Sequence, residues 1–92
     1  MYEIRSTKTY RKAFKRASRQ KDVDLRLLEE VIDTLAHGKK LHSRYKDHQL
    51  SGELKEFREC HIQNDVLLVY QRVDEVLILL LVNIGSHSEV FK

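Results

Sequence analysis

The sequence predicts one α+β domain spanning residues 1–92. We expect a small antiparallel β-sheet packed by an N-terminal helical hairpin, in the order β-α-α-β-β-β with a short C-terminal helical turn. Two stretches between residues 8 and 36 carry apolar side chains at helical spacing, and three apolar or alternating stretches follow between residues 54 and 84. The length of 92 residues allows one domain with one modest core.

The first elements are a short strand and a helix. Apolar and polar residues alternate over residues 2–5, as in a strand, and Ser6 or Thr7 can cap the helix that follows. The apolar residues of this helix share one face: Tyr10, Ala13, Phe14 and Ala17. The opposite face is almost wholly basic, which is typical of a solvated face and compatible with RNA binding.

A second helix should begin at Asp22 or Asp24 and end near Gly38. Its apolar stripe consists of Leu27, Leu28, Val31, Ile32 and Leu35. A polar, basic loop follows over residues 41–52. A loop of this length in a small domain is often functional.

Three strands are expected over residues 54–62, 66–72 and 76–84, joined by polar turns. The last stretch is almost entirely apolar, which indicates a central strand covered on both faces. Gly85 ends this strand, and Ser86 can cap a final helical turn that reaches Phe91.

The composition is that of a soluble globular domain, with 41% hydrophobic and 34% charged residues. The net charge of +3 and the pI of about 9.1 are compatible with nucleic acid or an acidic protein as a partner. The single cysteine, Cys60, favours a reducing cytoplasm and is interpreted as a small apolar strand residue. The start of the chain has no apolar signal region, and the longest apolar run, residues 76–82, is too short to span a bilayer. We therefore expect a cytoplasmic protein without a membrane partner.

The candidate site is a set of histidines with nearby carboxylates. Because side chains alternate along a strand, Glu59 and His61 should share one face, opposite Cys60, Ile62 and Arg58. Asp65 would lie across the turn from His61, and the loop with His48 and the segment with His87 could approach the same region. The sequence thus predicts a cluster of five residues: His48, Glu59, His61, Asp65 and His87.

Such a cluster fits the transesterification of RNA. One histidine can take the proton of the 2′-OH, and another can protonate the leaving 5′-oxygen. No metal or other cofactor is expected, because the nucleophile belongs to the substrate. A zinc site is the alternative, but the spacings match neither a HExxH helix nor a Cys/His knuckle.

Other interpretations of single residues stay open. His37 and His42 are interpreted as helix-end and loop residues, and a loop histidine such as His48 is often simply solvated. Asp65 can be an ordinary turn residue. Arg58 reaches the His61 face only if a bulge turns it, and is otherwise a partly buried arginine paired with a helix carboxylate.

Four segments in this order resemble the YafQ branch of the RelE/ParE toxin superfamily: Tyr45-Lys46-Asp47-His48-Gln49-Leu50, Leu54-Lys55-Glu56-Phe57-Arg58-Glu59-Cys60-His61, Asp65-Val66-Leu67-Leu68-Val69-Tyr70 and Gly85-Ser86-His87-Ser88-Glu89-Val90-Phe91. The resemblance covers essentially the whole chain. It implies the toxin of a type II toxin–antitoxin pair: an endoribonuclease that cuts mRNA, typically on the ribosome. It also implies a cognate antitoxin as partner and operator DNA only through the antitoxin complex.

The resemblance assigns catalytic or substrate-contacting roles to the five clustered residues. His48 or His61 would be the base, His87 the acid or a phosphate contact, and Glu59 and Asp65 would tune the histidines. The expected RNA-binding residues are Lys46, Lys55, Arg58 and Phe91; Phe91 could instead close the core.

The chain departs from the resemblance at two positions. Val66 stands where several relatives carry Trp, and Asn83 stands where relatives often carry Arg. These departures predict an altered base preference, and a slower nuclease or one that relies on Lys46 or Arg58. They also motivate an alternative, a module of the same fold that binds antitoxin and operator DNA with little nuclease activity. A ParE-like gyrase inhibitor is a third alternative, against which the set of histidines argues.

Overall fold

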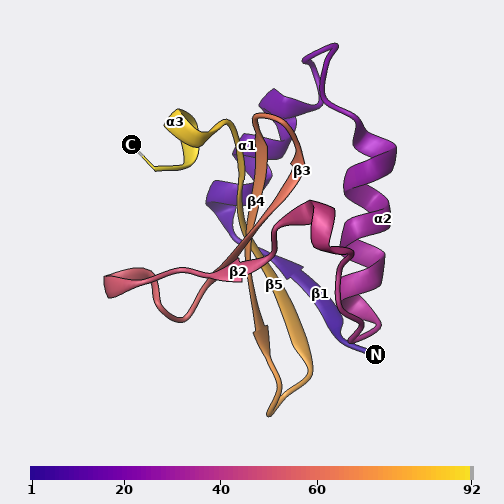
Figure 1. The fold of residues 1–92 in the computed structure, drawn as a ribbon, viewed down its shortest axis with the longest axis vertical. Coiled ribbons are helices and arrows are strands. Elements are labelled where there is room, and N and C mark those ends of the chain that lie inside the picture. The colour runs from indigo at the N-terminus through magenta and orange to yellow at the C-terminus, as the bar shows by residue number, and fades with distance from the viewer. Residues whose placement is uncertain (92) are drawn as a thin grey trace.

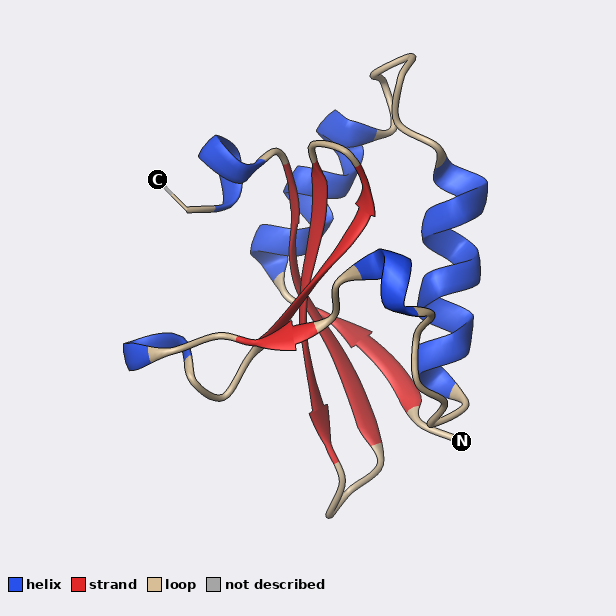
Figure 2. Ribbon diagram, viewed as in Figure 1, coloured by secondary structure: helices blue, strands red, loops and turns tan. Residues whose placement is uncertain are grey.

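The computed structural model describes residues 1–91 and confirms the predicted α+β class. Figures 1 and 2 show a twisted sheet with two long helices beside it and a short helix near the C-terminus. The elements are β1 (Glu3–Ser6), α1 (Lys8–Ala17), α2 (Leu25–Ala36), η1 (Ser43–Tyr45), β2 (His48–Gln49), η2 (Gly52–Leu54), β3 (Arg58–Gln63), β4 (Val66–Val73), β5 (Ile78–Gly85) and α3 (His87–Val90), where η marks a 3-10 helix.

The five strands lie in the order β1-β5-β4-β3-β2. β3, β4 and β5 form the predicted antiparallel meander, and β2 pairs antiparallel with β3. β1 pairs parallel with β5, so the sheet is mixed rather than wholly antiparallel. The connection explains this difference. After β1 the chain crosses the sheet through α1 and α2 and re-enters at the opposite edge, which leaves β1 beside the last strand.

The first and last residues of the observed strands differ from those predicted. β2 lies inside the segment that the sequence predicted as a loop, and β3 begins at Arg58 rather than Leu54 because Gly52–Leu54 forms a helical turn. Val76 and Leu77 belong to the turn of the β4–β5 hairpin and are 61% and 50% exposed. Leu77 has a φ of +52°, so the chain reverses here in the left-handed region and β5 starts only at Ile78.

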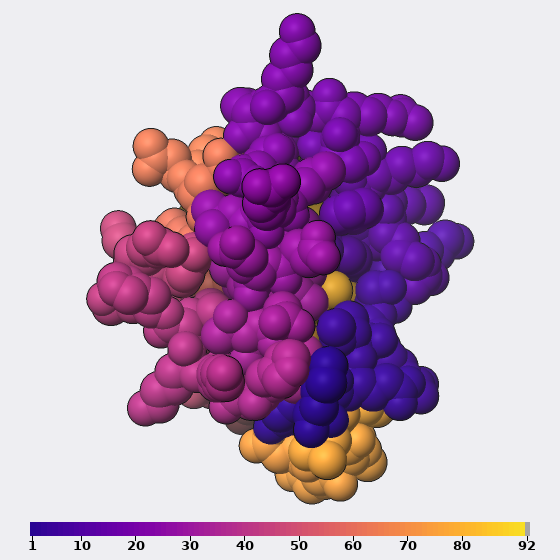
Figure 3. Space-filling model, turned by 90° about the vertical axis from the view of Figure 1, so that its right-hand side faces the viewer, coloured from indigo at the N-terminus to yellow at the C-terminus, as the bar shows by residue number. Residues whose placement is uncertain are grey.

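Side-chain caps fix where the two long helices begin. The Thr7 hydroxyl accepts a hydrogen bond from the Tyr10 N–H (2.9 Å), and the Asp24 carboxylate accepts one from the Leu27 N–H (3.1 Å). Both helices cover the same face of the sheet (Figure 1). They leave a hollow between them, seen in the space-filling view of Figure 3, whose lining includes Phe14, Ile32 and Leu81.

The main core lies between these helices and the sheet. Fully buried side chains from α2 and the three long strands form it, among them Leu28, Leu35, Cys60, Leu68, Tyr70, Leu79 and Ile84. The predicted interior positions Cys60 and Ile62 are buried, as strand alternation required. Glu59 and His61 therefore point to the other face of the sheet, here called the open face. Among residues 1–91, none of the helices has the length and apolar character that a membrane-spanning helix requires.

Candidate active site

A carboxylate on the open face lies between two imidazoles. Glu59 Oε2 is 3.4 Å from His48 Nε2, and Glu59 Oε1 is 3.6 Å from His61 Nε2. The two imidazole centroids are 6.4 Å apart. Glu59 is only 5% exposed, whereas both histidine side chains reach solvent. The structure thus brings together three of the five predicted residues, with the carboxylate below and the imidazoles accessible to a substrate.

Strand pairing places these three residues. Glu59 and His61 are two positions apart in β3, and His48 of β2 lies directly opposite Glu59. A β-bulge follows His61, where the register with β4 shifts before Gln63. The Gln63 carboxamide ties this bulge to the α1–α2 connection, because it accepts from the Asp24 N–H and donates to the Asp22 carbonyl, both at 2.7 Å.

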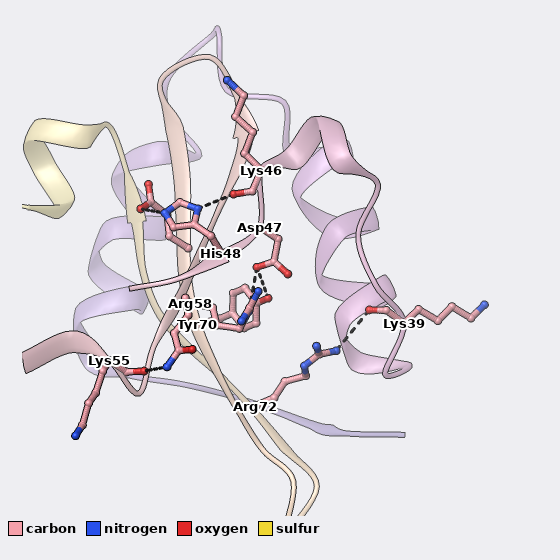
Figure 4. Close-up of polar contacts among 10 residues, drawn as sticks. Lys39, Lys46, Asp47, His48, Lys55, Arg58, Tyr70 and Arg72 are labelled. Carbon is pink, nitrogen blue, oxygen red and sulfur yellow. Dashed lines mark hydrogen bonds and ion pairs between the residues drawn. The ribbon is translucent and has the colours of Figure 1, made fainter. Parts of the chain in front are cut away.

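A hydrogen bond to the backbone selects the tautomer of His48. Its Nδ1 lies 2.7 Å from the carbonyl oxygen of Lys46, which can only accept, so Nδ1 carries a proton. Nε2 is then the atom that can gain or lose a proton, and this atom faces Glu59 (Figure 4). Lys46 adopts the left-handed conformation, with φ of +50°, which turns the chain sharply into β2.

A partly buried network anchors the turn that carries His48. Asp47 Oδ1 accepts from the Tyr70 hydroxyl at 2.6 Å and from Arg58 Nε at 3.3 Å (Figure 4). Burial raises the pKa of Tyr70 far above its usual range, and the bond to Asp47 adds to this effect. Burial lowers the pKa of Arg58, but its hydrogen bonds to Tyr70 and Asp47 outweigh this and the net shift is upward. The roles of Asp47 and Tyr70 were not predicted from the sequence; the only signal was a tyrosine in a strand rich in Val and Leu.

Asp65 and His87 form a second group. Asp65 Oδ1 accepts from the His87 backbone N–H at 3.1 Å, so the described contact of Asp65 is with the backbone at the start of α3 rather than with an imidazole. The His87 ring packs on Phe91, with centroids 5.2 Å apart. Ser86 and Glu89 form a capping box that fixes this turn. Asp65 thus orients the segment that presents His87 and Phe91.

A model of the family described as "Bacterial toxin of type II toxin-antitoxin system, YafQ" matches residues 2–92. The chain belongs to the YafQ toxin family.

Individual relatives agree with this membership. The mRNA interferase toxin YafQ of Escherichia coli strain K12 is 36% identical over 47 residues, which are 51% of this chain and 49% of that protein. A curated YafQ relative from Haemophilus influenzae is 42% identical over 61 residues, 64% of this chain and 60% of the relative. The matched stretches therefore span about half to three fifths of these two proteins.

Solved structures share the fold over the full chain. A metal-bound toxin from Helicobacter pylori is 45% identical with a TM-score of 0.90, covering 99% of this chain and 100% of that one. The YafQ chain of the E. coli DinJ–YafQ complex is 26% identical with a TM-score of 0.88, and the alignment covers 100% of both chains. Within residues 1–91 of the present protein, no three His, Cys, Asp or Glu side chains are grouped so that they could hold a metal ion.

The residues that the resemblance to YafQ toxins predicts to bind RNA differ from one another in their surroundings. Lys46 is exposed beside His61, and both line one hollow of about 320 Å³. Arg58 lies on the face opposite His61 and is paired with Asp47, which matches the paired-arginine alternative, although the carboxylate comes from the turn before β2. Lys55 is exposed in the loop after η2, away from His48 in Figure 4.

The two departures from the YafQ pattern have clear local roles. The Asn83 side-chain oxygen accepts from the Ile84 N–H at 2.8 Å, so this position supplies a local backbone contact and no positive charge. Val66 is a buried core residue.

Burial raises the pKa of the Cys60 thiol far above its usual range, as expected for an inert core cysteine.

Proposed function

We propose that this protein is a toxin that cleaves mRNA as a metal-independent endoribonuclease, and that a cognate antitoxin neutralises it. The observation that carries the proposal is the pair of accessible imidazoles held on one buried carboxylate, His48–Glu59–His61. The name of the E. coli relative, an mRNA interferase toxin, supports the substrate class. The solved DinJ–YafQ complex supports an antitoxin as the protein partner.

The proposed reaction is an internal transesterification. His48 or His61 removes the proton of a ribose 2′-OH through Nε2, and the 2′-oxygen forms a bond to the adjacent phosphorus. The bond from phosphorus to the 5′-oxygen breaks, and His87 protonates that oxygen. The products are a 2′,3′-cyclic phosphate and a free 5′-OH, so atoms and charges balance without a metal or another cofactor.

The charge that develops on the phosphate needs a cation. Asn83 supplies none, and Arg58 is turned to the other face of the sheet. Lys46 shares a hollow with His61, and no described ion pair engages its ammonium group. We therefore assign this role to Lys46, with Glu59 holding the two imidazoles in place and Phe91 available to stack on a base.

Because the substrate is mRNA, we place the activity in the cytoplasm, on messages bound to the ribosome. Operator DNA would be contacted only through the antitoxin complex. These assignments follow from the family and carry separate tests: cleavage of the same message with and without ribosomes, and binding of operator DNA with and without antitoxin.

Primer extension on a message during in vitro translation tests the proposal. The wild-type protein should produce discrete cleavage sites, and His61→Ala and His87→Ala should each abolish them. His37→Ala is the matched control and should leave cleavage intact, since His37 caps the C-terminal end of α2 and its ring contacts Asp33 of the same helix. Absence of cleavage by the wild type at any concentration would favour a binding module instead. Growth arrest that persists in the His61→Ala/His87→Ala double variant would favour a gyrase inhibitor.

A further inference from the structure

A second hollow, of about 530 Å³, lies outside the site described above. It is formed by the segment after α2 together with β3 and β4, and five basic side chains line it: Lys40, His42, Lys46, Arg58 and Arg72. Arg58 and Arg72 are on the helix side of the sheet, like Tyr70 between them, and not on the open face. Asp47 is the only carboxylate among the described residues that line it. We name this set the basic hollow.

The two arginines of the basic hollow are held in place. Arg58 Nε donates to Asp47, and Arg72 lies with its guanidinium carbon 5.8 Å from the ring centroid of Tyr2 and donates to the Lys39 carbonyl in a long contact of 3.5 Å (Figure 4). A guanidinium has five N–H donors, so these contacts leave several donors on each arginine. Asp47 is already occupied, because the same oxygen accepts from Tyr70 and Arg58. The hollow thus has fixed cations and a carboxylate already engaged.

The remaining polar groups are also donors. His42 Nδ1 accepts from the Arg44 backbone N–H at 3.0 Å, so the ring proton sits on Nε2, which can donate. Ser43 adds a hydroxyl, and Lys40 adds an exposed ammonium group. A lining of donors with excess positive charge selects a ligand that is anionic and rich in acceptor oxygens, and arginine favours phosphate in particular.

The basic hollow is continuous with the active site through one residue. Lys46 lines both this hollow and the one that contains His61. An RNA chain with its reacting phosphate at His48 and His61 can therefore pass Lys46 and place a neighbouring phosphate among Arg58, Arg72 and Lys40. We infer that the basic hollow binds a phosphodiester of the RNA substrate next to the cleaved position. This inference rests on the proposed function, and it gives roles to His42 and Arg72, which the sequence had not placed in a site.

Binding of an uncleavable RNA tests the inference apart from catalysis. The probe is a fluorescent, fully 2′-O-methylated oligoribonucleotide, which keeps every phosphate but has no nucleophile. Its affinity is measured by anisotropy between 50 and 200 mM salt for the wild type, Lys40→Gln/Arg72→Gln and the control Lys12→Gln/Lys15→Gln, which removes the same charge from α1. Each lost phosphate contact should reduce the slope of log K against log salt by about 0.7. The hollow is inferred to hold one phosphodiester, so the hollow variant should lose about 0.7 and bind more weakly.

The results separate failure of the inference from failure of the proposed function and from binding of the antitoxin in the basic hollow. Arg72→Lys keeps the charge and should keep most of the slope, and equal thermal midpoints by circular dichroism should show that the hollow variant is folded. If the hollow variant keeps the wild-type slope while the wild type cleaves unmodified RNA, the inference fails and the proposed function stands. If the wild type neither cleaves nor binds RNA, the proposed function fails. If the hollow variant binds RNA normally but loses the antitoxin, the occupant is an acidic segment of that protein and the inference is overturned.

Discussion

The hydrogen bond between Tyr70 and Asp47 is expected to make a large contribution to stability. Tyr70 is fully buried, and its hydroxyl donates to Asp47 Oδ1 at 2.6 Å. A hydrogen bond to a charged group is worth about 1.5–3 kcal/mol. In Tyr70→Phe the Asp47 carboxylate keeps Arg58 and partial contact with solvent, so we expect a loss of about 1.5–2 kcal/mol. In Asp47→Ala the buried hydroxyl and Arg58 both lose their partner, so the loss should reach about 2–4 kcal/mol.

A double-mutant cycle measures the coupling directly. Because both single variants break the same bond, the double variant Tyr70→Phe/Asp47→Ala should be less destabilised than the sum by about 1.5–2 kcal/mol. The assay is urea unfolding followed by far-UV circular dichroism, since the chain has no tryptophan. Each 1 kcal/mol should also lower the thermal midpoint by about 4–8 °C. A Tyr70→Phe loss below about 0.5 kcal/mol, together with additive single effects, would refute the network as the anchor of the turn before His48.

Three further predictions concern pH, a thiol and a glycine. Burial raises the pKa of Tyr10 to about 12, so its contribution is fully present below pH 10, the unfolded value. Tyr10 should then contribute a fall in the free energy of unfolding of up to about 1.4 kcal/mol per pH unit between pH 10 and 12, beyond what Tyr70 and Cys60 contribute. Tyr10→Phe should remove this contribution, and a variant with the wild-type slope would contradict the prediction. The buried Cys60 thiol should resist alkylation at pH 8 until urea unfolds the protein; rapid labelling of the native state would argue against its burial. Gly85→Ala should cost about 1–3 kcal/mol, because φ is +151° and the new Cβ would lie 2.9 Å from Glu89 Oε1; an unchanged thermal midpoint would contradict that estimate.

Local patterns in the sequence were sufficient for most of the fold. Alternation along β3 placed Glu59 and His61 on one face and Cys60 and Ile62 on the other, and the structure confirms this. Helical spacing and capping residues likewise located α1 and α2. These features depend on side chains only a few positions apart, so strand faces and helix positions can be predicted from a single sequence.

The rest of the site depends on contacts between distant segments. β2 is two residues long and is fixed by Asp47, whose partner Tyr70 is 23 positions away. Asp65 reaches the start of α3, 22 positions away, and its hydrogen bond goes to a backbone N–H, which no residue pattern signals. The predicted five-residue cluster therefore resolves into two groups. Lys46 and Arg58 were predicted to bind RNA, but the basic hollow in which they meet Arg72 was not predicted, because its residues come from three separate segments.

We propose that His48, Glu59 and His61 act together in proton transfer. The most direct test is the single-turnover rate of cleavage of one defined message by the wild type, His48→Ala, His61→Ala and Glu59→Gln, with 2′,3′-cyclic phosphate ends as the product assayed. Each histidine substitution should slow cleavage by about 10²-fold or more, and Glu59→Gln should slow it too while the fold is retained. Cleavage by both histidine variants within about threefold of the wild-type rate would contradict the account.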